Sequence, residues 1–161
     1  MKYMQNKFYQ IVALFCALFI NTALASDLPK TQPEFLSPDE AFIVSYELIS
    51  DKQVNINWKI HPGYYLYMGM FEFESLDQQN KIIKVEMPDG KKKTDEFFGE
   101  VDIYYQSAKA DVYLENDVID YIDLKIKYQG CADAGLCYPP VFKSIKVKKK
   151  VVSSNLKKVS F

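Results

Sequence analysis

Two cysteines, Cys131 and Cys137, are the side chains in this sequence whose type and spacing best fit covalent chemistry. The five residues between them include two alanines and a glycine, whose small size lets the chain fold back on itself. Residues 139 and 140 are both proline and stiffen the chain just beyond the pair. An even pair of cysteines in an exported protein can form a disulfide.

The spacing leaves the purpose of such a disulfide open. In the entropic model, closing so short a loop constrains the unfolded chain by only about 2 to 2.5 kcal/mol. A stabilising bridge would contribute more by joining distant strands or sheets, as in immunoglobulin domains. A short loop beside a rigid turn suits thiol–disulfide exchange, yet a structural staple is equally compatible with these residues.

The N-terminal segment has the pattern of a secretory signal peptide, which we place at residues 1–25. Lys2 and Lys7 precede an apolar run, and an Ala-Leu-Ala site ends at Ala25. The apolar run is short for a membrane span of about 20 residues, which disfavours a retained anchor. The third cysteine, Cys16, lies inside this run, and that position disfavours lipoprotein processing. We therefore expect cleavage after Ala25 and export.

The exported part contains few candidate residues for other kinds of catalysis. A structural zinc site needs four ligands, whereas this part offers two thiols and a single histidine, His61, far away in sequence. His61 stands in a His-Pro-Gly turn, where we expect an ordinary surface residue rather than the base of a cysteine nucleophile. Neither a glycine-rich phosphate loop nor a serine hydrolase motif is present. We expect no metal and no cofactor.

Residues 26–161 have the length of a single domain. They carry 18 lysines, no arginine and 21 acidic residues, and a charge balance near zero argues against nucleic acid as a partner. Seven of the lysines lie between Lys143 and Lys158. Lysines commonly guard an exposed edge strand. We favour this interpretation over a weak attraction to anionic lipid headgroups, which is worth about 1 kcal/mol per lysine.

The hydrophobic pattern of the exported part is that of β-strands. Residues 53–60 and 121–128 alternate strictly between polar and apolar side chains. Further strands are predicted at 41–48, 82–87, 101–105, 110–114 and 142–151. Turn-forming residues separate these segments, and no long stretch has a helical period. This spacing predicts an all-β sandwich of the immunoglobulin type, preceded by a loose arm at 26–38.

Two aromatic clusters admit a structural and a functional interpretation. Residues 63–67 are Gly-Tyr-Tyr-Leu-Tyr, and residues 94–100 are Thr-Asp-Glu-Phe-Phe-Gly-Glu. Tyrosine is common in strands, and paired phenylalanines commonly anchor a core. The same rings could instead wall or cover a reactive site, since each tyrosine combines an apolar body with a hydroxyl.

Residues 128–140, Tyr-Gln-Gly-Cys-Ala-Asp-Ala-Gly-Leu-Cys-Tyr-Pro-Pro, closely resemble the signature of the N-terminal periplasmic domain of DsbD, the thiol:disulfide interchange protein. The two aromatic clusters resemble the other two motifs of that domain, in the same order and at similar spacing. The resemblance covers residues 36–147, nearly all of the exported chain. It implies an immunoglobulin-like β-sandwich with a cap loop over a redox disulfide.

The resemblance also implies a function. Such domains are periplasmic thiol:disulfide oxidoreductases. They pass reducing equivalents from a membrane electron-transport protein to thioredoxin-fold proteins, such as a disulfide isomerase or a cytochrome c maturation factor. In the family, membrane helices and a thioredoxin-like domain follow this domain. We therefore expect a periplasmic electron-relay enzyme whose further parts come from a separate polypeptide, or one that serves a different relay.

The resemblance assigns roles to individual residues. Cys131 and Cys137 would be the redox couple: Cys137 forms the mixed disulfide with partners, and Cys131 resolves it. Phe97 would lie in the cap loop that shields the disulfide until a partner docks. Four further side chains would line the site: Tyr65, Tyr67, Asp95 and Glu96. A carboxylate close to a thiol raises its pKa, because it disfavours the thiolate.

Met68 and Gly69 depart from the resemblance, since basic residues are expected after Tyr67.

The alternative function is a non-enzymatic immunoglobulin-like binding module with a structural disulfide, such as an adhesin or a chaperone subunit. The two functions require different reduction potentials. A structural disulfide lies below about −300 mV, whereas a carrier must lie within exchange range of its partners.

Overall fold

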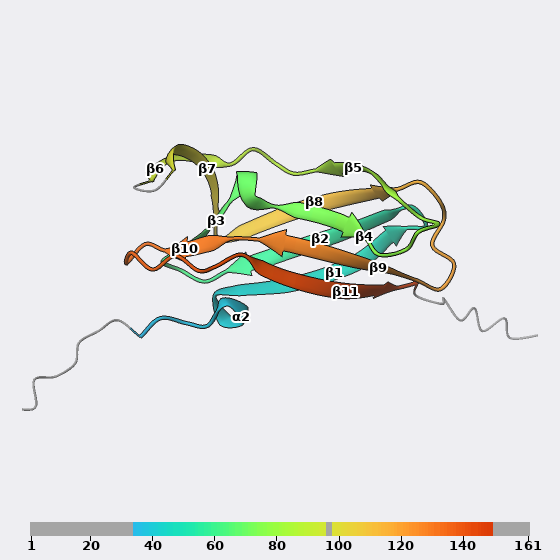
Figure 1. The fold of residues 1–161 in the computed structure, drawn as a ribbon, viewed down its shortest axis with the longest axis horizontal. Coiled ribbons are helices and arrows are strands. Elements are labelled where there is room, and N and C mark those ends of the chain that lie inside the picture. The colour runs from blue at the N-terminus through green and yellow to red at the C-terminus, as the bar shows by residue number, and fades with distance from the viewer. Residues whose placement is uncertain (1–33, 96–97, 150–161) are drawn as a thin grey trace, which may run out of the picture. The chain divides into compact units, whose positions relative to one another are not determined.

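The computed structural model describes residues 34–95 and 98–149, which form antiparallel β-structure with a short helix at its start (Figure 1). The helix α2 spans Pro38–Ala41, and a 3-10 turn, η1, spans Met68–Met70. The strands are β1 (Phe42–Ser50), β2 (Gln53–Ile60), β3 (Tyr64–Tyr67), β4 (Glu72–Ser75), β5 (Ile82–Glu86), β6 (Lys91–Asp95), β7 (Gly99–Tyr105), β8 (Ser107–Leu114), β9 (Tyr121–Tyr128), β10 (Gly130–Ala132) and β11 (Val141–Lys148). No helix in this part of the chain is long and apolar enough to cross a membrane.

Two of the sheets formed by these strands pack face to face. One has the strand order β1-β2-β8-β5 and the other β11-β9-β4, and their pairings are antiparallel. Aromatic rings join the inner faces. The ring of Trp58 on β2 lies 5.8 Å from that of Tyr128 on β9, which lies 6.2 Å from Phe42 on β1. This arrangement confirms the predicted all-β sandwich of the immunoglobulin type.

The strands of this core follow the predicted alternation. In β2, the side chains of Val54, Ile56 and Trp58 are fully buried, and in β9 every second residue from Ile122 to Tyr128 is buried. Successive side chains of a strand point to opposite faces, so a period of two places one row in the core. The other predicted segments also form strands, with ends that differ by a few residues.

Several elements differ from the sequence prediction. The strands β4, β6 and β10 were not predicted, and β3 lies in the tyrosine run for which strand packing was one of two interpretations. The helix α2 begins at Pro38, where only a loose arm was expected. In α2, the backbone N–H and the hydroxyl of Ser37 both donate to the Glu40 carboxylate, a capping arrangement that starts a helix. The predicted signal peptide, most of the arm and the end of the last predicted strand lie outside the described residues.

The remaining sheet, with strand order β10-β3-β7-β6, carries the cysteine pair. β10 pairs with β3 in a register that sets Cys131 opposite Tyr65. A Cβ on Gly130 would collide with the backbone carbonyl of Tyr65, and it would lie 2.7 Å from the Phe42 ring and 2.8 Å from the Leu66 side chain. Glycine at position 130 therefore permits the close strand pairing that fixes Cys131 at the edge of this sheet.

Candidate active site

Cys131 and Cys137 form a disulfide with their Cα atoms 4.0 Å apart, which confirms the predicted pairing. The bond closes a tight turn. The N–H of Ala132 donates to the carbonyl of Leu136 at 2.7 Å, and Gly135 has a φ of +97°, a conformation that favours glycine. The two cysteines differ in exposure, since Cys131 is fully buried and Cys137 is half-buried. An approaching partner therefore has readier access to the sulfur of Cys137.

Tyr67 and Asp95 lie next to the disulfide. The Tyr67 hydroxyl is 3.2 Å from Cys131 Sγ, and it donates a hydrogen bond to Asp95 Oδ2 at 2.7 Å. The Tyr65 hydroxyl donates to the same carboxylate oxygen at 3.0 Å, and the backbone N–H of Phe98 donates to Oδ1 at 3.2 Å. Asp95 is only 7% exposed. Two tyrosines of β3 and a backbone amide thus hold a buried carboxylate close to the sulfurs.

The hydrogen-bond donors around Asp95 suit a negative carboxylate. Burial raises the pKa of the Tyr65 and Tyr67 hydroxyls above the ordinary tyrosine value, and the nearby Asp95 carboxylate raises both further. Both hydroxyls therefore remain protonated donors at neutral pH. An ionised carboxylate is an acceptor only, so three donors suit its charged form. The site consequently places a stabilised negative charge beside the cysteine pair.

A second polar cluster lies next to Cys137. The Tyr105 hydroxyl donates to Asp133 Oδ1 at 2.7 Å, and Lys93 Nζ lies 3.5 Å from the same oxygen. The Lys93 ammonium also lies 4.9 Å from the centre of the Tyr65 ring, within cation–π range. Together with Cys137, Lys93 and Asp133 line a cavity of about 170 Å³. A cation and a carboxylate thus flank the more exposed sulfur.

The structure brings three of the predicted site-lining side chains together: Tyr65, Tyr67 and Asp95. The other two predicted residues, Glu96 and Phe97, lie outside the described residues, so the cap over the disulfide stays a prediction. His61 is exposed, as predicted. Among residues 34–95 and 98–149, no group of three or more His, Cys, Asp or Glu side chains is placed to hold a metal ion.

Sequence reasoning missed three polar residues of the site: Lys93, Tyr105 and Asp133. Asp133 had a usable signal, because a residue inside so short a loop between two cysteines must lie near both sulfurs. Lys93 and Tyr105 had none. They belong to β6 and β7, and only the pairing of these strands with each other and with β3 brings them to the site.

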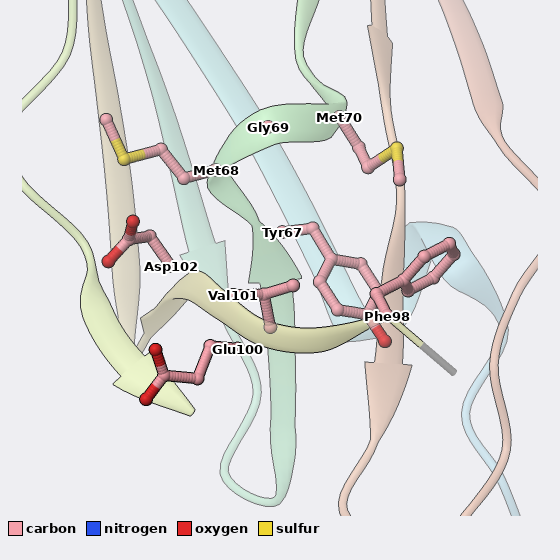
Figure 2. Close-up of a pocket in the computed structure, with 8 residues that line it drawn as sticks. All are labelled: Tyr67, Met68, Gly69, Met70, Phe98, Glu100, Val101 and Asp102. Carbon is pink, nitrogen blue, oxygen red and sulfur yellow. The ribbon is translucent and has the colours of Figure 1, made fainter. Parts of the chain in front are cut away.

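A larger cavity of about 510 Å³ adjoins the tyrosine cluster (Figure 2). Eight residues line it: Tyr67, Met68, Gly69, Met70, Phe98, Glu100, Val101 and Asp102. Tyr67 belongs both to this wall and to the cluster around the disulfide. The two residues that depart from the resemblance, Met68 and Gly69, are therefore part of a cavity beside the site.

Comparison with known proteins identifies related sequences. The chain matches the family model described as thiol:disulfide interchange protein DsbD, N-terminal, over residues 32–149. It is similar to thiol:disulfide interchange protein DsbD 2 of Pseudomonas aeruginosa, with 42% identity over 110 residues that cover 68% of this chain and 18% of that protein. It is 30% identical over 161 residues to DsbD of Yersinia pestis, covering 94% of this chain and 26% of the relative. The chain thus spans about a quarter or less of the length of these relatives.

Two solved structures share the fold. The DsbD N-terminal domain of Neisseria meningitidis in the reduced form aligns with a TM-score of 0.63 at 30% identity, covering 71% of this chain and 90% of that one. A chain from the complex between the DsbD N-terminal and PilB N-terminal domains of the same species aligns with a TM-score of 0.61 at 30% identity, covering 70% and 87%. Because the family model spans most of the sequence and the fold agrees with it, this chain belongs to the family of DsbD N-terminal domains.

Proposed function

We propose that this protein is a periplasmic thiol:disulfide oxidoreductase. It passes reducing equivalents from a membrane reductase to thioredoxin-fold clients through Cys131 and Cys137. The observation that carries the proposal is the unequal exposure of the two cysteines, since Cys137 is half-buried and Cys131 is fully buried. Exchange needs one accessible sulfur to enter a mixed disulfide and a second that attacks from within. A purely structural disulfide does not require one sulfur to be more accessible than the other.

The proposed reaction moves two electrons and two protons. In the reduced protein, the Cys137 thiolate attacks one sulfur of a client disulfide, and the other client sulfur leaves as a thiolate that takes up a proton. The Cys131 thiolate then attacks Cys137 Sγ and releases the remaining client sulfur as a second thiol. The Cys131–Cys137 disulfide forms, and a dithiol donor at the membrane reduces it again by the same exchange.

The buried carboxylate supports a role as a reductant. A negative charge beside the cysteines disfavours their thiolates, so the reduced pair would persist as thiols that react slowly with small oxidants. Tyr67 lies between Asp95 and Cys131 and orients this carboxylate. A ring of Phe97 over the disulfide, as the resemblance implies, would add a steric barrier that a docking client removes.

The partners and the location are further parts of the proposal. A structure of the Neisseria relative was solved as a complex with the PilB N-terminal domain, which supports the docking of another protein domain onto this fold. We extend this to thioredoxin-fold clients, a disulfide isomerase or a cytochrome c maturation factor. The proposed periplasmic location rests on the signal peptide predicted at residues 1–25, with the domain predicted at residues 26–161.

A trapping experiment tests the proposal. In the Cys131→Ala variant, a mixed disulfide on Cys137 cannot be resolved. Thioredoxin-fold proteins from an envelope extract should therefore stay attached until dithiothreitol releases them. The matched control, Cys137→Ala, keeps only the buried thiol and should capture far less. The relay is refuted if the first variant captures no thioredoxin-fold protein. A reduction potential below about −300 mV would instead favour the binding module with a structural disulfide.

A further inference from the structure

The larger cavity is continuous with the cluster around Cys131. Met70 packs against that cluster, and the ring of Tyr67, whose hydroxyl contacts the buried sulfur, forms another part of the cavity wall. The Phe98 ring meets the Tyr67 ring edge-to-face, with centroids 5.4 Å apart. A polypeptide joined to Cys137 in a mixed disulfide thus has the cavity within reach of the residues next to its own cysteine.

One side of the cavity is acidic. Figure 2 shows the carboxylates of Glu100 and Asp102, both on β7, on one side of the cavity and the rings of Tyr67 and Phe98 on the other. Asp102 forms an ion pair with Lys92 of β6 at 2.9 Å. Glu100 is exposed and forms no short ion pair with the residues that the structure describes, although Lys92 attracts it at longer range: Asp102 first, and Glu100 more weakly, raise the pKa of Lys92. Because Glu100 is exposed and Lys92 is held by Asp102, the Glu100 carboxylate stays accessible to a cation from outside.

The η1 turn supplies only uncharged side chains to the cavity. It contributes Met68, Gly69 and Met70, and the first two stand where the resemblance led us to expect basic residues. A Cβ added at Gly69 would meet no atom within 4 Å, so the space beside it is open. The cavity therefore combines an apolar wall, open space and an exposed carboxylate that forms no short ion pair within the described part of the chain.

We propose that this cavity binds a lysine or arginine side chain of the redox partner, located close to the partner's reactive cysteine. The inference rests on the proposed function, because it concerns the protein that Cys137 reacts with. The aliphatic stem packs on Met68, Met70 and Val101, as the stems of basic residues do on apolar surfaces. The charged end reaches Glu100 on the acidic side of the cavity. Methionine side chains adapt their shape, so either basic residue fits.

Synthetic peptides test this binding directly. Each peptide carries one cysteine as a 2-thiopyridyl disulfide, flanked by lysine, arginine, glutamine, norleucine or glutamate. When the Cys137 thiolate of the reduced protein attacks the peptide sulfur, thiopyridone is released, and its absorbance reports the rate. We expect the lysine and arginine peptides to react about tenfold faster than the glutamate peptide at low salt. The difference should shrink at high salt, because salt screens electrostatic steering.

Matched variants locate the effect. Glu100→Gln should remove most of the preference for basic peptides. Glu115→Gln changes the net charge equally but follows β8, so it should leave the preference intact. Gly69→Lys places a cation in the open space and should slow the lysine peptide several-fold more than the uncharged Gly69→Gln. The rate of each variant with uncharged dithiodipyridine is its own reference, so the ratio of the lysine-peptide rate to this rate separates binding in the cavity from any change in thiol acidity.

Three results would overturn the inference and leave thiol exchange standing. Equal rates for lysine and glutamate peptides would show that the carboxylates of the cavity do not favour basic partners. A norleucine peptide that reacts as fast as the lysine peptide would show an apolar site instead. A lysine-peptide rate constant that falls as the protein concentration rises would show that a second copy fills the cavity. Failure of every peptide, together with failure of trapping, would instead count against the proposed function.

Discussion

The charge of Asp95 should control the acidity of the cysteine pair once it is reduced. The Tyr67 hydroxyl lies 2.7 Å from the carboxylate, 3.2 Å from Cys131 Sγ and 3.9 Å from Cys137 Sγ. The carboxylate therefore lies within about 6 to 7 Å of both sulfurs. Asp95→Asn removes the charge with little change in shape, and the amide oxygen can still accept the tyrosine hydrogen bonds.

The magnitude follows from Coulomb's law. A unit charge about 6 Å from a thiolate raises its free energy by about 3 kcal/mol at an effective dielectric constant of about 20, which corresponds to about 2 pKa units. Solvent screens the half-buried Cys137 more than the buried Cys131. Since removing a negative charge favours the thiolate, Asp95→Asn should lower the pKa of the more reactive thiol by about 1 to 2 units.

The assay is the rate of alkylation of the reduced protein by iodoacetamide as a function of pH, because only the thiolate reacts. The midpoint of the profile should move to lower pH in Asp95→Asn. Asp117→Asn, an exposed carboxylate paired with Lys52 at 3.9 Å, is the control and should leave the profile unchanged. Thermal unfolding shows whether each variant is folded. A folded Asp95→Asn protein with an unshifted profile would refute the electrostatic role assigned to this carboxylate.

Three further changes test the core, the strand pairing and the predicted cap. Tyr128→Phe should stabilise the protein by about 1 kcal/mol in urea unfolding, because the buried hydroxyl has no hydrogen-bond partner among the described residues; an unchanged or lower stability would contradict this. Burial raises the pKa of Tyr128 to about 12, so the unfolded chain loses this proton first and stability falls as pH rises from about 10 to 12; near pH 11 the advantage of the variant should grow by about 1 kcal/mol. Gly130→Ala should cost about 1 to 3 kcal/mol through its clashes with β3, whereas Gly69→Ala, next to open space, should change the free energy of unfolding little; equal effects would contradict the role of Gly130. Phe97→Ala should leave the fold intact and make the reduced pair oxidise faster in air, and unchanged oxidation kinetics would remove the cap from the mechanism.

The strands that could be predicted from the sequence are those with one buried face. β2 and β9 alternate because one row of side chains fills the core and the other faces outward. β3 has no such pattern, because all four of its residues, Tyr64–Tyr67, are buried: one row lies in the main core and the other under the active site. β6 begins with three lysines, and it forms a strand because β7 pairs with it. The residues of one strand do not show which distant strand pairs with it.

The geometry of the site, too, could be predicted from the sequence only in part. Tyr65 and Tyr67 are two residues apart in a strand, so their shared face follows from the period of two. That this face meets Cys131, which is 64 residues from Tyr67, depends on the pairing of β10 with β3. The unequal exposure of Cys131 and Cys137 likewise depends on packing around the turn. The resemblance could suggest these neighbours, but distances and burial come only from the fold.

Asp95 and Glu100 are five positions apart, yet they should act on different steps. Asp95 is buried beside the sulfurs, where its charge acts on the proton equilibrium of the thiols and is screened little by salt. Glu100 is exposed at the cavity, where its charge acts on an approaching partner and is screened. Asp95→Asn should therefore shift the pH profile at every salt concentration and keep the preference for basic peptides, whereas Glu100→Gln should do the reverse. If Glu100→Gln moved the thiol pKa as far as Asp95→Asn, the two carboxylates would form a single field that sets thiol acidity, and partner selection would need another surface.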